Sequence, residues 1–213
     1  VEYRGSADGE ALQNAAILAR IYSGDADVAL RRVLDRETGP GADKTTLDVL
    51  MSAALEELAS KSDEMTFSKV VIGNLNKISN APITDSSRLN TSERLIDMGF
   101  FDAALEMMTR YNGEGDEEAK LILARAFLGT GEPDAALRYA SQVPGEEARG
   151  IEAKAYFYLN EPEKALQSLE GLGEGTNKDT FAVIAEDWNG LEGSQNPDVA
   201  RFAESVLATL PIS

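Results

Sequence analysis

Hydrophobic positions recur with helical spacing along much of the chain. One apolar stripe with a period near 3.6 covers 45–60 and a second covers 67–78. Two more cover 121–128 and 137–143, on either side of a short polar segment. Stripes of this period, arranged in pairs around short turns, predict helical hairpins and an all-α fold.

A heptapeptide repeats along the chain and places these hairpins in register. Its copies begin at 24, 99, 131, 160 and 195, with the sequences GDADVAL, GFFDAAL, GEPDAAL, NEPEKAL and QNPDVAR. The alanine near the end of each copy falls at 29, 104, 136, 165 and 200. The first step, from 29 to 104, is close to two periods and predicts one degenerate unit between 41 and 81. About six units of about 30–37 residues then account for the chain.

The heptapeptide has the composition of a helix stop, a tight turn and a helix start. Gly or Asn ends the first helix because it tolerates a left-handed backbone. Pro133, Pro162 and Pro197 stand where the next helix begins, and an acidic residue follows each proline in the first turn.

A small residue stands twelve positions before the repeated alanine in three units, at Ser92, Ala124 and Ala153. Two helices cross closely where both carry small side chains. We therefore predict contacts of Ala124 with Ala136 and of Ala153 with Ala165. Ile17 and Trp188 hold the matching position in the first and last units.

This pattern resembles the tetratricopeptide repeat (TPR): a small residue in the first helix, Gly at the turn and Ala in the second helix. Phe127 and Tyr156 match the aromatic position of that family, whereas Lys120 and Arg149 stand where the family has Trp. The closing Pro of the family is absent, and the resemblance is best over 115–173. It implies a right-handed α-solenoid of about six helix-turn-helix repeats, forming a single domain over 1–213. The linker-like segment 80–87 could instead be a hinge between 1–79 and 88–213.

Charge and composition exclude several classes of function. The chain has 37 acidic and 20 basic residues, a net charge of −17, and this field repels nucleic acid and anionic lipid heads. It has neither His nor Cys. Ser–His–Asp and Cys–His nucleophiles, structural zinc sites and disulfides are therefore excluded, and no metal or other cofactor is expected. Carboxylates remain as the only plausible catalytic acids and bases.

In solenoids of this kind the first helix of each pair lines a concave groove. The residues that follow the small position point into it, and here they are Leu18, Glu93, Arg125, Lys154 and Asn189. One turn further on lie Ile21 and Tyr22, Ile96 and Asp97, and Phe157 and Tyr158. Arg125 and Lys154 would be neighbours able to capture an acidic or C-terminal carboxylate of a peptide. The alternative, which we favour, is a Glu93–Arg125 surface ion pair.

The function expected from these features is a non-catalytic interaction module that presents a groove to a protein or peptide partner. The alternative is a structural spacer segment of a larger polypeptide, membrane-anchored or exported, because the sequence lacks an initiator Met. A carboxylate-based hydrolase ranks third. No apolar run approaches the roughly 18–20 residues of a membrane span and no signal peptide is recognisable, so we expect a soluble chain without direct membrane insertion, in the cytoplasm or the periplasm.

Overall fold

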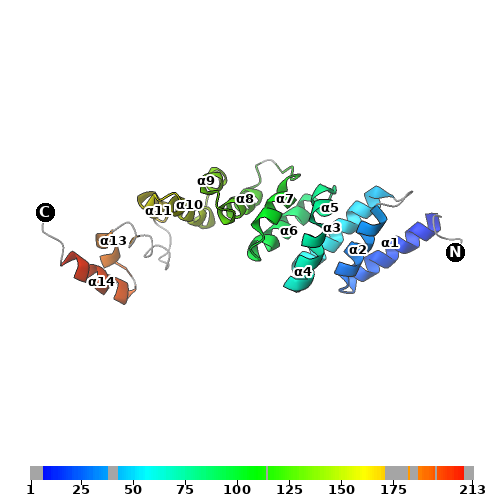
Figure 1. Cartoon of the computed structure of the whole chain (residues 1–213), viewed down its shortest axis with the longest axis horizontal. Coiled ribbons are helices and arrows are strands. Elements are labelled where there is room, and N and C mark those ends of the chain that lie inside the picture. The colour runs from blue at the N-terminus through cyan, green and yellow to red at the C-terminus, as the bar shows by residue number, and fades with distance from the viewer. Residues whose placement is uncertain are drawn as a thin grey trace. The chain divides into compact units, whose positions relative to one another are not determined.

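The computed structural model describes residues 7–37, 43–113, 115–170, 182, 187–194 and 196–208. These residues form helices, turns and short loops and contain no strand, so the predicted all-α class is confirmed (Figure 1). The chain divides into two compact units, Val1–Ala126 and Phe127–Ser213. None of the helices that the structure describes has the length and apolar character needed to cross a lipid bilayer.

The first unit is a series of helices packed around one continuous apolar core. Neighbours in the series pack on one another: α1 on α2, α2 on α3, α3 on α6, and α6 on α7. The bounds are α1 Ala7–Tyr22, α2 Ala26–Glu37, α3 Lys44–Lys61, α4 Glu64–Val71, a 3-10 turn Ile72–Asn74, α5 Leu75–Asn80, α6 Asp85–Asp97 and α7 Phe101–Met108.

The second unit repeats the hairpin arrangement on a smaller scale. α10 packs on both α9 and α11, and α13 packs on α14. Helix α8 (Glu117–Gly129) contains the boundary between the units, and the remaining bounds are α9 Pro133–Ala140, α10 Glu146–Tyr158, α11 Pro162–Ser168, α13 Trp188–Glu192 and α14 Pro197–Leu207.

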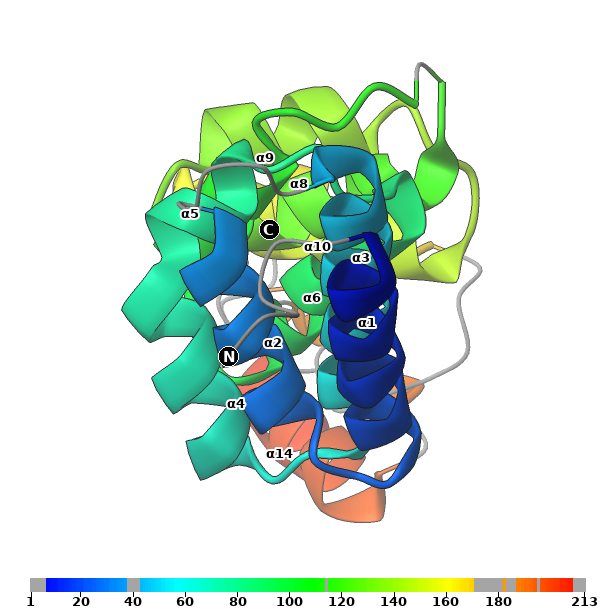
Figure 2. The ribbon, with the colours of Figure 1, turned by 90° about the vertical axis from the view of Figure 1, so that its right-hand side faces the viewer.

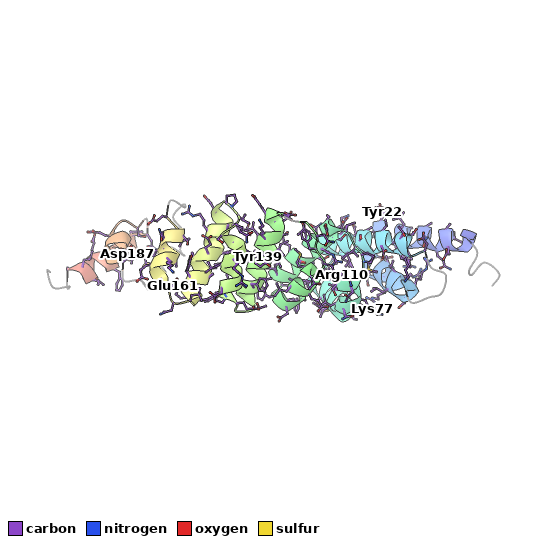
Figure 3. All side chains as sticks on the ribbon, turned by 90° about the horizontal axis from the view of Figure 1, so that it is seen from above. Tyr22, Lys77, Arg110, Tyr139, Glu161 and Asp187 are labelled. Atoms are coloured by element: carbon purple, nitrogen blue, oxygen red, sulfur yellow. The ribbon has the colours of Figure 1, made fainter. Side chains whose placement is uncertain are left out.

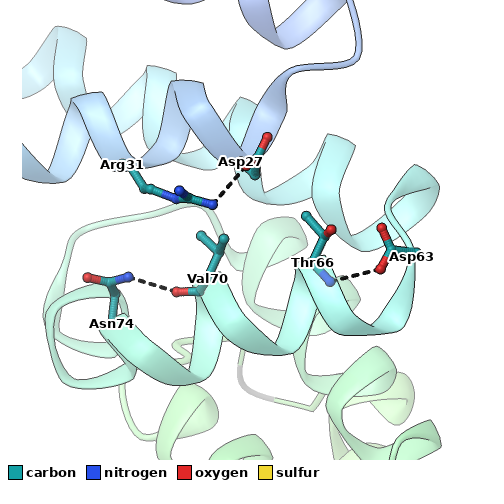
Figure 4. Close-up of polar contacts among 6 residues, drawn as sticks. All are labelled: Asp27, Arg31, Asp63, Thr66, Val70 and Asn74. Atoms are coloured by element: carbon teal, nitrogen blue, oxygen red, sulfur yellow. Dashed lines mark hydrogen bonds and ion pairs between the residues drawn. The ribbon is translucent and has the colours of Figure 1, made fainter.

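The degenerate unit forms the predicted helix pair, with one difference. The first stripe is α3, whose apolar residues are buried, and the second begins at α4, where Asp63 accepts a hydrogen bond from the Thr66 amide at 2.9 Å (Figure 4). The second helix is interrupted at Ile72–Asn74, where the Asn74 side-chain amide donates to the Val70 carbonyl at 2.8 Å. Such a side-chain bond competes with the helical ladder and explains the break.

The repeated turns adopt the conformation that their sequence predicts. Gly24, Gly99, Gly131 and Asn160 have positive φ angles of 91°, 80°, 80° and 60°. At each of them the amide bonds to the carbonyl three residues back, and the next amide bonds to the carbonyl five residues back. This pair of bonds is the Schellman motif, which satisfies the last carbonyls of a helix.

The small residues at the helix crossings are buried as predicted in most units. Ala153 and Ala165 are fully buried and lie in one apolar cluster, where α10 packs on α11, as that prediction requires. Ser92 is fully buried in α6, which packs on α7. Ala124 and Ala136 are fully buried but belong to different units, so their contact stays a prediction.

The last unit departs from the pattern at its repeated alanine. Ala29, Ala104, Ala136 and Ala165 are fully buried, whereas Ala200 is only half-buried. Gln195 and the Trp188 side chain lie outside the described residues, so their predicted roles stay predictions.

The segment 80–87 lies inside the first unit and is fixed there by buried polar contacts. The Arg88 side chain, 2% exposed, donates to the carbonyls of Ser79 at 3.0 Å, Ala81 at 2.6 Å and Met107 at 2.9 Å. The Thr84 amide also donates to a hydroxyl of α3 at 3.1 Å. Because Arg88 meets the ends of both α5 and α7, it ties this segment to the next hairpin.

Arg149 occupies the same repeat position in the second unit and makes the equivalent bond. Its Nε donates to the Ser168 carbonyl at 2.8 Å, and its guanidinium also donates to the Glu170 carbonyl. Ser168 follows Arg149 by nineteen residues, and Met107 follows Arg88 by the same nineteen. In both hairpins a basic residue in the first helix therefore caps the second helix, where its charge also opposes the negative end of the helix dipole.

A tyrosine–aspartate pair precedes α8. The Tyr111 hydroxyl donates to the Asp116 carboxylate, and the other Asp116 oxygen accepts from the Glu118 amide at 2.9 Å. Burial and this hydrogen bond raise the pKa of Tyr111 to about 12. The same hydrogen bond lowers the pKa of Asp116 below its ordinary value.

Candidate functional site: an acidic cleft in the first unit

A cleft of about 480 Å³ opens between α3 and α6, with the start of α4 at its edge. Its walls carry four carboxylates, one arginine, two neutral polar side chains and two apolar side chains. These residues are Glu56, Ala59, Ser60, Glu64, Asn90, Glu93, Arg94, Asp97 and Met98.

Helical spacing gathers the polar groups of one wall. Asn90, Glu93, Arg94 and Asp97 follow one another at intervals of three, one and three residues, which is one face of α6. The opposite wall comes from the last two turns of α3. The packing of α3 against α6 therefore brings acidic residues that lie far apart in the sequence to the same hollow.

The arginine of the cleft has its positive charge engaged by the protein itself. Arg94 donates to the carbonyls of Leu58 at 2.9 Å and Ala59 at 2.6 Å, and also to the Ser62 carbonyl. Its guanidinium lies 4.7 Å from the centre of the Phe67 ring, a cation–π distance. Arg94 thus caps the end of α3 and forms part of the cleft wall, which leaves the carboxylates in excess.

Glu56 is held in place by the start of α6. The Ser87 hydroxyl donates to its carboxylate at 2.9 Å, and the Thr84 hydroxyl lies at 3.5 Å. Thr84 is also the N-cap of α6, since its side chain accepts from the Ser87 amide. The carboxylate on this side of the cleft is therefore positioned before any ligand arrives.

Arg125, from α8, binds both acidic residues on the outer side of α6. Its guanidinium lies 3.4 Å from the Glu93 carboxylate and 2.7 Å from the Asp97 carboxylate, and its side chain is 27% exposed. The Glu93–Arg125 ion pair that the sequence favours is thus present. Asp97, which the sequence places in the groove but does not pair with Arg125, extends the ion pair.

The other predicted groove residues lie in the second unit. Lys154 and Tyr158 are exposed on α10, and Phe157 is half-buried with its ring centre 6.0 Å from that of Tyr158. Asn189 falls in α13, with its side chain outside the described residues. Since Arg125 and Lys154 belong to different units, their expected proximity stays a prediction.

A second hollow, of about 520 Å³, lies on the α10–α11 hairpin and has mixed charge. In its wall the Lys164 ammonium lies 2.6 Å from the Glu161 carboxylate and 5.5 Å from the centre of the Tyr156 ring. Burial raises the pKa of Glu152 in the same wall. Both cations of this hollow are engaged within the hairpin, Lys164 by Glu161 and Arg149 by the carbonyls of Ser168 and Glu170.

No grouping of three or more acidic residues with the geometry of a metal site occurs among the residues that the structure describes. No protein-family model, curated protein or solved structure matches the chain.

Proposed function

We propose that the chain is a non-catalytic interaction module, built as a right-handed α-solenoid of about six TPR-like hairpins, whose acidic cleft binds a basic segment of a partner protein. The repeat architecture is supported by the four left-handed turns with the same pair of hydrogen bonds. The arginine bond that spans nineteen residues in each of two hairpins supports it independently of the turns.

The contact of Arg125 with Glu93 and Asp97 carries the proposal for the partner's chemistry. These two carboxylates already hold a guanidinium at 3.4 and 2.7 Å, so their spacing suits an arginine side chain. Glu56 and Glu64 line the same cleft without a basic partner of their own among its lining residues. The net charge of −17 would also attract a basic segment over a longer range.

Capture of an acidic peptide by Arg125 and Lys154 is the less favoured alternative, because Arg125 is engaged by two carboxylates of its own unit. The two modes of binding differ in the sign of the ligand's charge. They are therefore separated by one titration series with three fluorescent peptides of equal length, rich in arginine, rich in glutamate, or uncharged.

We expect the arginine-rich peptide to bind and the other two to bind far more weakly, measured by fluorescence anisotropy at low and moderate salt. The double variant Glu93→Gln/Asp97→Asn should weaken this binding by about 3- to 30-fold, since each partly exposed charge contact contributes up to about 1 kcal/mol. The matched control Asp134→Asn/Glu163→Gln removes two exposed carboxylates from α9 and α11 and should leave binding within about twofold.

Two results would contradict the proposal. Equal weakening by both double variants would mean that general charge, not the cleft, attracts the peptide. Preference for the glutamate-rich peptide, strengthened when Glu93→Gln/Asp97→Asn releases Arg125, would favour the carboxylate-capture mode instead.

A further inference from the structure

The chain contains two Asn-Gly pairs, Asn112–Gly113 and Asn189–Gly190. An asparagine followed by glycine is prone to deamidation, because glycine has no Cβ to hold its backbone nitrogen away from the asparagine side chain. The sequence alone gives the two pairs the same reactivity. The structure places them in different backbone environments and so distinguishes them.

The first pair lies in the connection between α7 and α8, which end and begin at Met108 and Glu117. In Figure 2 this green connection runs outside the helices, at the top of the view. The Asn112 side chain is exposed. Within the described part of the chain, neither this side chain nor the Gly113 amide makes a hydrogen bond. No such bond therefore has to break before the Gly113 nitrogen meets the Asn112 side chain.

The contacts of Tyr111 explain why a glycine stands at position 113. The Tyr111 hydroxyl donates to the Asp116 carboxylate, and the Asp116 amide donates to the Gly113 carbonyl at 3.4 Å. A Cβ added to Gly113 would overlap the Tyr111 ring and its hydroxyl. The packing that closes this loop thus requires the residue that makes Asn112 reactive.

The second pair is protected by the start of a helix. Asn189 and Gly190 lie within α13, and the Gly190 amide donates at 3.1 Å to the carboxylate of Asp187, the N-cap (Figure 3 labels Asp187). In a helix each side chain is also tilted toward the N-terminus, away from the nitrogen of the following residue. The cap and the first turn must therefore open before Asn189 can react.

We infer that Asn112 is a site of spontaneous deamidation, through which the folded chain acquires an additional negative charge. The Gly113 amide nitrogen loses its proton and attacks Cγ of Asn112, which closes a succinimide ring. The bond from Cγ to Nδ2 breaks, and the side-chain nitrogen leaves with a proton as ammonia. Water then opens the ring at either carbonyl and leaves aspartate or isoaspartate at 112, so the reaction requires only water.

The reaction alters a loop that Tyr111 and Asp116 hold closed. An isoaspartyl linkage carries the backbone through the side chain and lengthens it directly before Gly113, which packs against the Tyr111 ring. The new carboxylate adds to the negative charge ahead of α8, whose first turn already carries Glu117 and Glu118. Deamidation therefore converts the chain into a form that differs in charge and in the course of this loop.

The test is incubation of the full chain at neutral and at mildly alkaline pH, followed by tryptic digestion and mass spectrometry. Peptides 111–120 and 179–201 report on Asn112 and Asn189, and synthetic standards separate the aspartyl from the isoaspartyl products. We expect Asn112 to react at least about fivefold faster than Asn189, because loss of an N-cap alone costs about that factor. The rate at Asn112 should rise with pH, since the attacking nitrogen must lose its proton.

Unfolding in guanidinium chloride is the matched control, because both asparagines follow an aromatic residue and should react at similar rates once the chain is unfolded. Asp187→Ala should speed the reaction at Asn189 and leave the rate at Asn112 unchanged. Asn112→Gln should remove the product in peptide 111–120. An Asn112 that stays intact in the folded chain, a folded-state rate at Asn189 equal to or above that at Asn112, or an Asp187→Ala variant with an unchanged rate at Asn189 would each overturn the inference.

Discussion

Replacing Arg88 by methionine is expected to destabilise the first unit by about 2–4 kcal/mol. Methionine fills much of the volume of the arginine stem but donates no hydrogen bond. The side chain is 2% exposed, so the three carbonyls that it serves, those of Ser79, Ala81 and Met107, lose their donor where water has little access.

The magnitude is the difference between two opposing effects. Each buried acceptor left without a partner costs about 1–3 kcal/mol, so three of them cost about 3–9 kcal/mol. Removing the cation recovers the cost of burying its charge, which is several kcal/mol. That cost is also visible in the pKa of Arg88, which burial lowers from its ordinary value. Arg88→Lys keeps the charge but loses the planar fork, and should fall between the wild type and Arg88→Met.

The assay is urea-induced unfolding of the full chain followed by far-ultraviolet circular dichroism, with hydrogen exchange at the amides of α5, α6 and α7 to locate the effect. Arg32→Met is the matched control, because Arg32 is exposed on α2 of the same unit, and it should change the free energy of unfolding by less than about 0.5 kcal/mol. The reasoning fails if Arg88→Met is no more destabilising than Arg32→Met, or if the added exchange falls outside these helices.

Three further predictions test the repeat and its electrostatics. Ala165→Leu should overpack the hairpin crossing and cost about 1–3 kcal/mol in urea unfolding, whereas Ala200→Leu, at the half-buried equivalent, should cost less; equal costs would argue against close packing. Gly131→Ala should destabilise the protein by about 1–2 kcal/mol because the φ angle of Gly131 is +80°, whereas Gly150→Ala, inside α10, should stabilise it by about 0.5–1 kcal/mol. The two variants should therefore shift Tm in opposite directions, and neither added Cβ meets an atom within 4 Å. Because the pKa of Tyr111 in the folded chain is raised to about 12, its contribution to the free energy of unfolding is fully present below pH 10 and is lost as the pH rises through 12. In an ultraviolet titration, Tyr111→Phe should remove this late-titrating phenol, and an unchanged titration curve would contradict the assignment.

The features that the sequence predicts well are those with a local cause. A left-handed residue at the end of a helix and a proline at the start of the next depend only on backbone sterics, so Gly24, Gly99, Gly131 and Asn160 could be placed without tertiary information. The apolar stripe of α3 was equally readable, because its periodicity lies within one helix. The break in the following helix was not predicted, although it falls at Gly73, a poor helix former, and at Asn74, whose side chain bonds to the backbone.

The cleft could not be predicted, because it depends on how two distant helices dock. Arg94 reaches the carbonyls of Leu58 and Ala59 across 36 and 35 residues, and no local pattern reports such a bond. Glu56 and Glu64 belong to the unit without the repeated heptapeptide. The repeat therefore does not predict which residues of α6 lie opposite them. One signal was present and went unused: Arg88, like Lys120 and Arg149, stands four residues before the small position of its unit.

That repeat position links the fold to the charge of its surface. The ends of helices present unpaired carbonyls, which attract guanidinium groups, and Arg88, Arg94 and Arg149 all donate to such carbonyls. In a chain with 37 acidic and 20 basic residues, each arginine engaged in this way is no longer available to neutralise a carboxylate. On α6 both arginines serve backbone carbonyls, so the cation that Glu93 and Asp97 share is Arg125 of α8. Four carboxylates line the cleft, and the capping that stabilises the hairpins thus contributes to its acidic character.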